Sequence, residues 1–249
     1  MRHPTVETMP SGRPARQLDL RDAMLVVAGF TGRDQQALDA HVAELRTLGV
    51  PAPSHTPLIF VLPSWLLQID PGRVHVASEH TSGEVEPVLI REAGGELHVT
   101  VGSDHTDRHL EQASYGASKF ACPKPIASVA WPLMEVADRW DELRLDAGVD
   151  QHLAPYQSAS VSTLCDPGEL LAEVDCRLDT AGRPLVLFLG TVPVLDESAR
   201  FASAFSCGLH DRSRSIRLAY AVDVIDPLDA SLASLVPPST ADAAGTSTV

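Results

Sequence analysis

The sequence predicts a β-rich mixed α+β fold, a β-sandwich or rolled sheet with a few peripheral helices. Segments with the apolar or alternating pattern of strands outnumber segments with helical spacing, and the connections between them are short. The regular strand-to-helix alternation of a doubly wound fold is absent from the sequence. So are the G-x-G-x-x-G and P-loop motifs that accompany nucleotide-binding folds of that kind.

The expected strands are short segments rich in β-branched and other apolar residues. They span residues 22–29, 57–62, 73–77, 84–91, 96–102, 184–190 and 215–225. Residues 57–62 and 184–190 have the continuous apolar pattern of buried strands, whereas 215–225 alternates between apolar and polar residues. The strands at 84–91 and 96–102 are joined by Ala93-Gly94-Gly95, a connection typical of a hairpin.

Helical spacing appears in fewer places. The expected helices span residues 34–48, 107–120 and 132–140. Gly49 and Pro51 end the first of these, as glycine and proline commonly do beyond a helix C-terminus. Pro132 suits the first turn of the third helix, which places Trp140 on its apolar side.

The chain is expected to divide into three parts. Residues 1–56 form an N-terminal segment with a strand and a helix, preceded by a ragged leader over residues 1–19. Residues 57–230 form the main domain, a β-roll. Residues 231–249 have too little apolar content to order themselves and are expected to be a disordered tail.

Charge and composition exclude several classes of partner. The formal net charge of −14 argues against nucleic acid and anionic membranes, both of which require clustered basic residues. No apolar run reaches the roughly 18 residues of a membrane helix, and no signal peptide is visible. The four cysteines form no C-x-x-C pair, so we expect reduced thiols and a cytoplasmic protein.

The strongest local signal is the segment Gly83-Glu84-Val85-Glu86-Pro87-Val88. Residues two apart in a strand point to the same face and lie about 6.5–7 Å apart, so Glu84 and Glu86 project together. Pro87 has no N–H for a ladder, which predicts an edge strand or a bulge. A solvated strand face would show the same pair of glutamates, so the pair alone does not establish a site.

A third carboxylate, Asp104, follows the next expected strand, and a hairpin would bring it back beside the two glutamates. Three converging carboxylates with no lysine among them repel one another and are best stabilised by a divalent cation. Ligands that are all oxygen suit Mg²⁺, Mn²⁺ or Ca²⁺ better than Zn²⁺. The sequence therefore predicts a metal site at Glu84, Glu86 and Asp104.

Six ordered pieces between Gly29 and Pro193 resemble the fumarylacetoacetate hydrolase family, in a branch known mainly as a domain of unknown function. The pieces are His41-x-x-Glu44, Pro57 to Pro63, Glu84-x-Glu86, Ser103 to Arg108, Ser118 to Pro123, and Gly190-Thr191-Val192-Pro193. This resemblance implies a mixed β-roll of that family's type, a homodimer, and dependence on Mg²⁺ or Mn²⁺. It implies that Glu84, Glu86 and Asp104 hold the metal, that His41, Glu44 and Lys119 are catalytic, and that Arg108, Gly190 and Thr191 bind substrate.

The sequence departs from the family pattern in the expected pocket. Leu62 stands where the family usually has a lysine that holds the acid end of the substrate or steadies a carbanion. Val194 stands where many members have glycine. The resemblance therefore supports the metal ligands more strongly than it supports the residues of the substrate pocket.

Three functions agree with these patterns. The first is a metal-dependent hydrolase that cleaves a C–C bond in a small diketo or 2-oxo acid, with His41 and Glu44 activating water. The second is a metal-dependent lyase, namely a decarboxylase, hydratase or tautomerase acting on a 2-oxo acid. The third is a non-catalytic protein that binds small acids.

Overall fold

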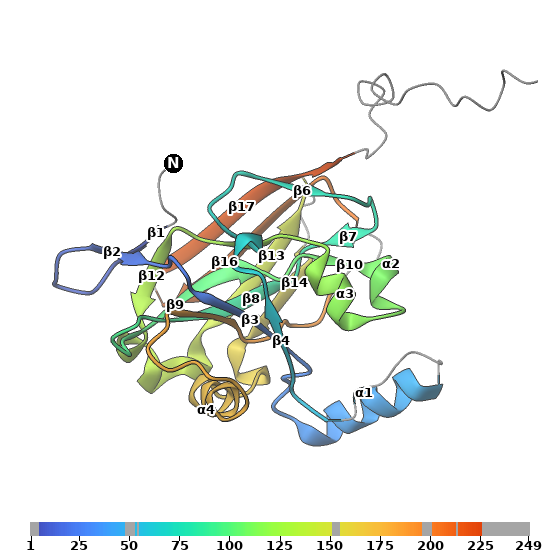
Figure 1. Ribbon diagram of the computed structural model, residues 1–249, viewed down its shortest axis with the longest axis horizontal. Helices are drawn as coiled ribbons and strands as arrows, with labels where there is room; N and C mark the ends of the chain where they lie inside the picture. The colour runs from blue at the N-terminus through green and yellow to red at the C-terminus, as the bar shows by residue number, and fades with distance from the viewer. Residues whose placement is uncertain are drawn as a thin grey trace, which may run out of the picture.

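The computed structural model describes residues 5–47, 53, 55–150, 155–195, 201–212 and 214–225. Within these residues the strands form two large sheets and one two-stranded pair, with helices at the periphery (Figure 1). This arrangement confirms the β-rich α+β class. Some neighbouring strands are parallel and others antiparallel, so the sheets are mixed, as the sequence predicts.

The larger sheet holds ten of the described strands. Its main order is β2 (Arg16–Asp19), β1 (Thr5–Thr8), β12 (Val129–Pro132), β9 (Leu97–Ser103), β8 (Val85–Arg91), β15 (Leu185–Phe188), β3 (Met24–Gly29) and β4 (Leu58–Leu62). Two further strands, β11 (Lys124–Ile126) and β5 (Leu67–Ile69), join it beside β9. The β8–β9 hairpin, expected from the sequence, therefore lies in the middle of the sheet.

The second sheet contains five of the described strands. Its order is β14 (Gln157–Ser160), β13 (Arg144–Val149), β16 (Ala204–Asp211), β17 (Arg214–Val224) and β6 (Arg73–Val76). A separate pair joins β7 (Thr81–Ser82) to β10 (Thr106–Asp107). The alternating burial of β6 and β17 confirms the alternation in their sequences.

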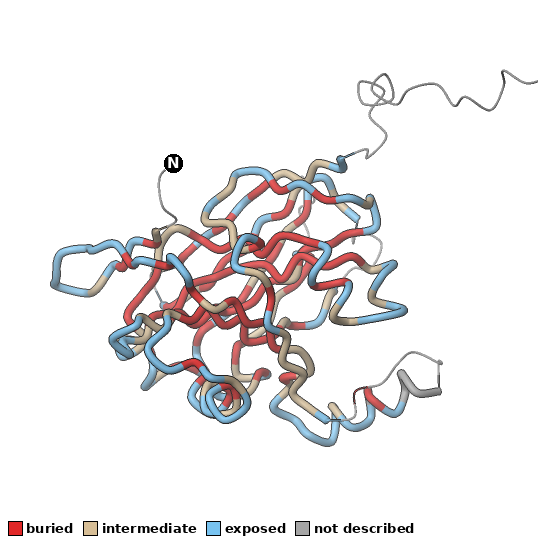
Figure 2. The backbone as a smooth tube through the Cα atoms, in the orientation of Figure 1, coloured by how far each residue is buried: buried red, intermediate tan, exposed pale blue. Residues whose placement is uncertain are grey.

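Both faces of the larger sheet are buried, which explains why its central strands are apolar at successive positions. In β3, Val26 belongs to the core shared with the second sheet, whereas Val27 belongs to a second apolar cluster on the opposite face. In β15, Leu187 and Phe188 divide in the same way. Figure 2 shows this buried interior and the exposed helices around it.

The helices lie at the edges of the sheets. The α-helices are α1 (Gln35–Thr47), α2 (Arg108–Glu111), α3 (Tyr115–Phe120) and α4 (Pro167–Arg177). Residues 107–120 are expected as one helix, but Ser114 accepts a hydrogen bond from Ala117 N–H and begins a second one. The helix α4 is absent from the sequence-based expectations, although Asp166 and Pro167 form a standard helix start.

The expected α-helix over 132–140 is wrong in type. This segment forms two 3₁₀ helices, η2 (Leu133–Glu135) and η3 (Ala137–Glu142). Val136 and Arg139 have φ angles of −128° and −134°, which interrupt any continuous helix. Trp140 is nevertheless buried, as expected.

Residues 1–19 are not a ragged leader within the part that the structure describes. Strand β1 pairs in parallel with β12 and antiparallel with β2. Val6 and Leu18 are fully buried in the second apolar cluster. Sequence reasoning missed these strands because each is only four residues long and rich in polar residues on its outer face.

Two expectations about strand position are also wrong. Strand β8 is central, not an edge strand, because it pairs with β9 on one side and with β15 on the other. Its pairing with β15 ends at Val88, so the missing N–H of Pro87 removes no hydrogen bond from that ladder. Strand β4 is an edge strand, not a buried one, and Val61 on it is 53% exposed.

Other expectations stay predictions. Strands from residues 1–56 and from the rest of the chain share the ten-stranded sheet. The division of the chain at residue 56 stays a prediction. Residues 231–249 lie outside the described residues. None of the described helices has the length and apolar content needed to cross a membrane.

Candidate metal centre and substrate cavity

The carboxylates of Glu84, Glu86 and Asp104 meet at one point. One oxygen of each lies within 4.8 Å of the others. The hairpin register causes this, because it pairs Val85 with Ser103 and lets Asp104 N–H donate to Glu84 C=O at 3.0 Å. The predicted convergence of the three acids is therefore present.

Cations surround this cluster, contrary to the expectation that no lysine lies among the acids. Lys119 Nζ lies 2.8 Å from Glu84 Oε2 and 2.6 Å from Asp104 Oδ2. Lys124 Nζ, fully buried, lies 3.1 Å from Asp104 Oδ1. Strand periodicity does not place these lysines here, because Lys119 comes from α3 and Lys124 from β11, although the family resemblance already implied a catalytic role for Lys119.

The two glutamates experience opposite electrostatic environments. Burial, and then the charges of Asp104 and Glu84, raise the pKa of Glu86 well above its ordinary value. Burial opposes ionisation of Glu84 as well, but Arg108 and Lys119 outweigh it and hold the pKa of Glu84 below its ordinary range. The neighbouring cations therefore compensate the charge of Glu84 more fully than that of Glu86.

These residues fit a divalent cation. All three candidate ligands are oxygens, which is the donor set that Mg²⁺ and Mn²⁺ prefer. Asp104 Oδ1 is buried and has no hydrogen-bond partner among the described residues, since Lys124 is near it without hydrogen-bond geometry. A buried oxygen of this kind is an available ligand atom.

Gly190 and Thr191 follow β15 and lie against the cluster. Gly190 N–H donates to Glu86 Oε2 at 2.7 Å and so fixes that carboxylate. The φ of Gly190 is +102°, and a Cβ there would lie 1.8 Å from Thr31 Oγ1, so only glycine fits. Thr191 Oγ1 donates to Val85 C=O at 2.9 Å, which ties this turn to the start of β8.

Gln157 is a functional residue that sequence reasoning missed. It is fully buried at the start of β14, and its Oε1 accepts a hydrogen bond from Val85 N–H at 3.0 Å. Its Nε2 donates to Thr191 Oγ1 at 2.9 Å and to Val192 C=O at 2.6 Å. Gln157 thus connects the strand of the glutamates with the turn after β15.

Arg108, at the start of α2, borders the metal cluster. Its guanidinium contacts Glu84 Oε1 at 2.9 Å and Glu111 Oε2 at 2.8 Å, and Nε donates to Ser82 Oγ at 2.7 Å. These contacts leave two of the five N–H groups of the guanidinium without an assigned partner among the described residues. The side chain is buried except for about a tenth of its surface, so it faces the site and not bulk solvent.

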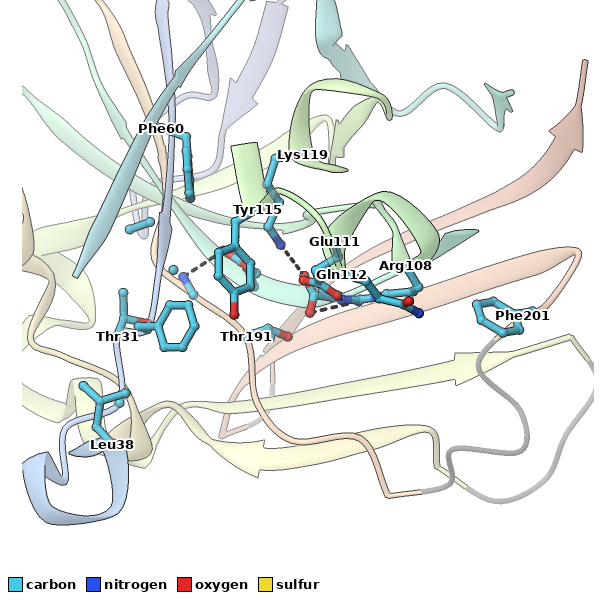
Figure 3. A pocket seen from close by; sticks show the side chains of 17 residues that line it. Thr31, Leu38, Phe60, Arg108, Glu111, Gln112, Tyr115, Lys119, Thr191 and Phe201 are labelled. Carbon is cyan, nitrogen blue, oxygen red and sulfur yellow. Dashed lines mark hydrogen bonds and ion pairs between the residues drawn. The ribbon is translucent and has the colours of Figure 1, made fainter. Parts of the chain in front are cut away.

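The site opens into a cavity of about 590 Å³ (Figure 3). Its walls come from the end of β3, from α1, β4, α2 and α3, and from the turn after β15. The lining residues are Ala28, Gly29, Phe30, Thr31, Gly32, Leu38, Phe60, Glu84, Glu86, Arg108, Glu111, Gln112, Tyr115, Lys119, Gly190, Thr191 and Phe201. Six of the nine predicted site residues line it, namely Glu84, Glu86, Arg108, Lys119, Gly190 and Thr191. Asp104 is not among the lining residues but contacts Lys119 at 2.6 Å.

His41 and Glu44 lie in α1, but their side chains are outside the described residues. Leu38 of the same helix lines the cavity. His105, which is adjacent to Asp104, uses both ring nitrogens within the core, with Tyr220 Oη at 3.1 Å and Thr81 Oγ1 at 2.9 Å. Burial lowers the pKa of His105 to about 3, so it is a neutral structural residue.

Tyr115, Glu111 and Gln112 are further cavity residues that sequence reasoning missed. One signal was available for Tyr115, because it precedes Lys119 by four residues and thus shares a helix face with it. Glu111 and Gln112 had no comparable signal, because polar residues at the end of a short helix are usually exposed.

Solved structures share this fold at low sequence identity. The apo form of 2-keto-3-deoxy-D-arabinonate dehydratase has a TM-score of 0.63 and 16% identity, over 86% of this chain and 77% of that one. The same dehydratase complexed with magnesium and 2,5-dioxopentanoate has a TM-score of 0.61 and 16% identity, over 87% and 79%. A putative fumarylpyruvate hydrolase from Burkholderia cenocepacia has a TM-score of 0.61 and 13% identity, over 90% and 96%.

A search among curated proteins finds no match by sequence. The similar structures confirm the expected fold of the fumarylacetoacetate hydrolase type. The family described as "Protein of unknown function (DUF2848)" matches residues 28–220, which is most of the chain. This agrees with the branch of unknown function indicated by the sequence motifs, and the chain belongs to the DUF2848 family.

Proposed function

We propose that this protein is a divalent-metal-dependent hydrolase that cleaves a C–C bond in a small diketo or 2-oxo acid. The observation that carries the proposal is the convergence of Glu84, Glu86 and Asp104 within 4.8 Å at the wall of a cavity. The structural similarity to a dehydratase complexed with magnesium and 2,5-dioxopentanoate supports both the cation and the oxo-acid class.

A bound Mg²⁺ or Mn²⁺ would act as a Lewis acid and stabilise the enolate charge that develops when the C–C bond breaks. Glu84, Glu86 and Asp104 would hold the ion, and Gly190 N–H fixes the orientation of Glu86. The remaining N–H groups of Arg108 face the cavity and bind the substrate carboxylate, since a guanidinium matches the geometry of that group.

Lys119 contributes a fixed positive charge in this proposal. Its ammonium contacts Glu84 and Asp104 and also donates to Thr106 Oγ1 at 3.0 Å, so its three N–H groups all have partners. A cation held in this way stabilises negative charge near the metal without moving during the reaction.

His41 and Glu44 are the proposed pair that activates water. At i and i+3 on α1 they are neighbours on the helix surface, and a glutamate beside a histidine favours its role as a base. The contribution of Leu38 to the cavity wall supports this assignment, because it brings the same helix to the site.

The test is a panel of acylpyruvates and 2-oxo acids incubated with the full chain and Mg²⁺ or Mn²⁺. We expect cleavage that EDTA abolishes and that the variant Glu86→Gln lacks, since this variant removes a ligand but keeps the oxygen that accepts from Gly190 N–H. His41→Ala should lose turnover and retain metal affinity by calorimetry. Turnover that persists in Glu86→Gln would contradict the proposal.

A metal-dependent lyase acting on a 2-oxo acid is the second candidate. The observation that favours it is Leu62, which stands at the family's lysine position and is buried in an apolar cluster. Cleavage in ¹⁸O-labelled water separates the two candidates. A hydrolase incorporates the label into a carboxylate product, whereas a decarboxylase or dehydratase does not.

A third outcome is binding without turnover by any acid of the panel. That result would show a binding protein, and it would remove both enzymatic proposals.

A further inference from the structure

The cavity has two chemically different halves (Figure 3). Around the three carboxylates most lining residues are charged or polar, with Arg108, Glu111 and Gln112 on one side and Phe201 beyond Arg108. On the other side lie Phe60, Leu38 and the ring of Tyr115. A three- or four-carbon acid needs only the first half, because cavities of about 300–1,000 Å³ hold much larger ligands.

The apolar half is built by four separate segments, namely the residue after β3, α1, β4 and α3. Phe30 directly follows β3 and has a φ of +57°, an unusual conformation for a bulky residue, and its ring packs edge-to-face on Tyr115 with centroids 5.3 Å apart. Phe60 of β4 lies against α3, since a Cβ added to Gly116 would be 3.6 Å from its ring. Sparsely populated backbone conformations cluster at ligand sites, which fits the place of Phe30 in this wall.

The charges of the cavity lie at the metal end. The cations among the described lining residues are Arg108 and Lys119, and both already pair with carboxylates of that end. The side chains of Phe30, Leu38 and Phe60 offer no charge to a ligand. A second carboxylate placed among them would lose its hydration without gaining a partner, which is strongly unfavourable.

Tyr115 places a polar group between the two halves. Its hydroxyl is shielded from solvent and has no hydrogen-bond partner among the described residues. The residue lines the cavity, and in Figure 3 its ring extends into the space between Thr31 and Thr191. An unpartnered phenol in this position suits a ligand that brings an oxygen to the boundary of the apolar half.

We propose that the apolar half, formed by Phe30, Leu38, Phe60 and Tyr115, binds an uncharged apolar or aromatic acyl tail of the oxo acid. The Tyr115 hydroxyl donates to the oxo group on the tail side, and tails that end in a second carboxylate are discriminated against. This inference rests on the proposed function for its polar end.

The first test compares three substrates that share a 2,4-dioxobutanoate head and differ at carbon 4. One has a phenyl tail, one a methyl tail and one a carboxyvinyl tail. We expect kcat/KM for the phenyl compound to exceed that for the carboxyvinyl compound by roughly 10- to 200-fold, as for other apolar pocket contacts. Equal values, or a preference for the carboxylated tail, would overturn the inference while leaving the proposed hydrolase intact.

Leu38→Lys tests the charge argument by gain of function. Leu38 is half-buried on α1, so a lysine there can reach the apolar half with its ammonium near the surface. The preference should shift at least tenfold toward the carboxyvinyl tail. Ala37→Lys adds the same charge at the neighbouring exposed position and should leave the preference unchanged.

Tyr115→Phe keeps the ring and removes the hydroxyl. It should lower kcat/KM about tenfold for the phenyl diketo acid, with melting temperature and Mg²⁺ affinity unchanged. If the lower activity is accompanied by a lower melting temperature, Tyr115 has a structural role and its part in the inference is overturned.

Binding measurements separate failure of this inference from failure of the proposed function. Isothermal titration of the Mg²⁺-loaded protein with the same three acids gives their dissociation constants without any turnover. If none is cleaved but the phenyl compound binds most tightly, the enzymatic proposal fails and the tail preference stands. If the carboxyvinyl compound binds as tightly as the phenyl compound, the tail preference fails whatever the turnover.

Discussion

Lys124 Nζ lies 3.1 Å from Oδ1 of Asp104, and both side chains are buried. The same ammonium donates to His105 C=O at 2.6 Å and to Cys122 C=O at 3.0 Å. Lys124 therefore holds both a candidate metal ligand and the loop that presents it. Neither the charge nor the aliphatic stem of the residue reaches the cavity wall, so its role is to position Asp104.

Lys124→Met should destabilise the protein and weaken Mg²⁺ binding. Removing one partner of a buried ion pair typically costs about 3–5 kcal/mol, and here two carbonyls also lose a donor. Urea unfolding and calorimetric titration with Mg²⁺ measure the two effects. The double variant Lys124→Met, Asp104→Asn should cost less in unfolding free energy than the sum of the single variants; strict additivity would contradict direct coupling.

Gln157→Leu tests the link between β14 and the turn that carries Thr191. The substitution leaves Val85 N–H and Val192 C=O without their partners. Each buried group left unsatisfied costs about 1–3 kcal/mol, so we expect a clear decrease in the free energy of unfolding by urea. Gln36→Leu, on the exposed side of α1, is the control and should change stability little. Equal effects of both variants would exclude a special role for Gln157.

Gly190→Ala should damage the metal centre. The new Cβ meets Thr31 Oγ1 at 1.8 Å, and the φ of +102° is unfavourable for any residue with a Cβ. The turn must move, and Gly190 N–H then leaves Glu86. We expect a loss of about 1–3 kcal/mol of stability and weaker Mg²⁺ binding by calorimetry. Gly94→Ala, which has nothing within 4 Å of its added Cβ, should leave both quantities unchanged.

Asp211 gives a prediction of pH dependence away from the metal centre. Hydrogen bonds from Arg139, and then from Arg214, lower its pKa from the ordinary value of 3.8 to about 2. The native state therefore releases this proton more readily than the unfolded chain, and the stabilisation is complete above pH 3.8. It is lost as the pH falls from 3.8 through about 2.

Asp211→Asn should lower the free energy of unfolding at pH 7 by an amount on the order of 1 kcal/mol, because solvent partly screens the two guanidiniums. The variant and the wild type should converge near pH 2, as measured by urea unfolding across the acid range. Asp138→Asn alters a carboxylate whose side chain is 79% exposed and is the control. A constant difference at every pH would show that packing, not charge, explains the effect.

The sequence predicted the convergence of the three carboxylates because the patterns that indicate it are local. The two glutamates lie two apart in one strand, and a short hairpin brings back Asp104. Local patterns also predicted β3, β15 and β17, whose apolar or alternating content is strong. Features that are set by a single hairpin register or by the periodicity of one segment can be predicted from the sequence alone.

The remaining parts of the site depend on distant segments that meet only in the folded chain. Gln157 reaches Val85 across 72 positions, and Lys124 reaches His105 from a strand with no local signal of function. Strands β1 and β2 are too short and polar to be recognised, and the partner β12 that stabilises β1 lies far along the chain. Tertiary contacts decide these features, so single-sequence reasoning does not predict them.

The composition of the chain gives its two lysines an experimental use. Lys119 and Lys124 are the only lysines in the sequence, and both are buried beside Asp104. Reagents that acylate amines therefore meet no lysine on the outer surface, where the α-amine of the chain terminus is the amine that remains. The rate at which such a reagent acylates Lys124 reports how readily the interior opens, whereas Lys119 lines the cavity, so occupants of the cavity can be ranked by how far they slow its labelling.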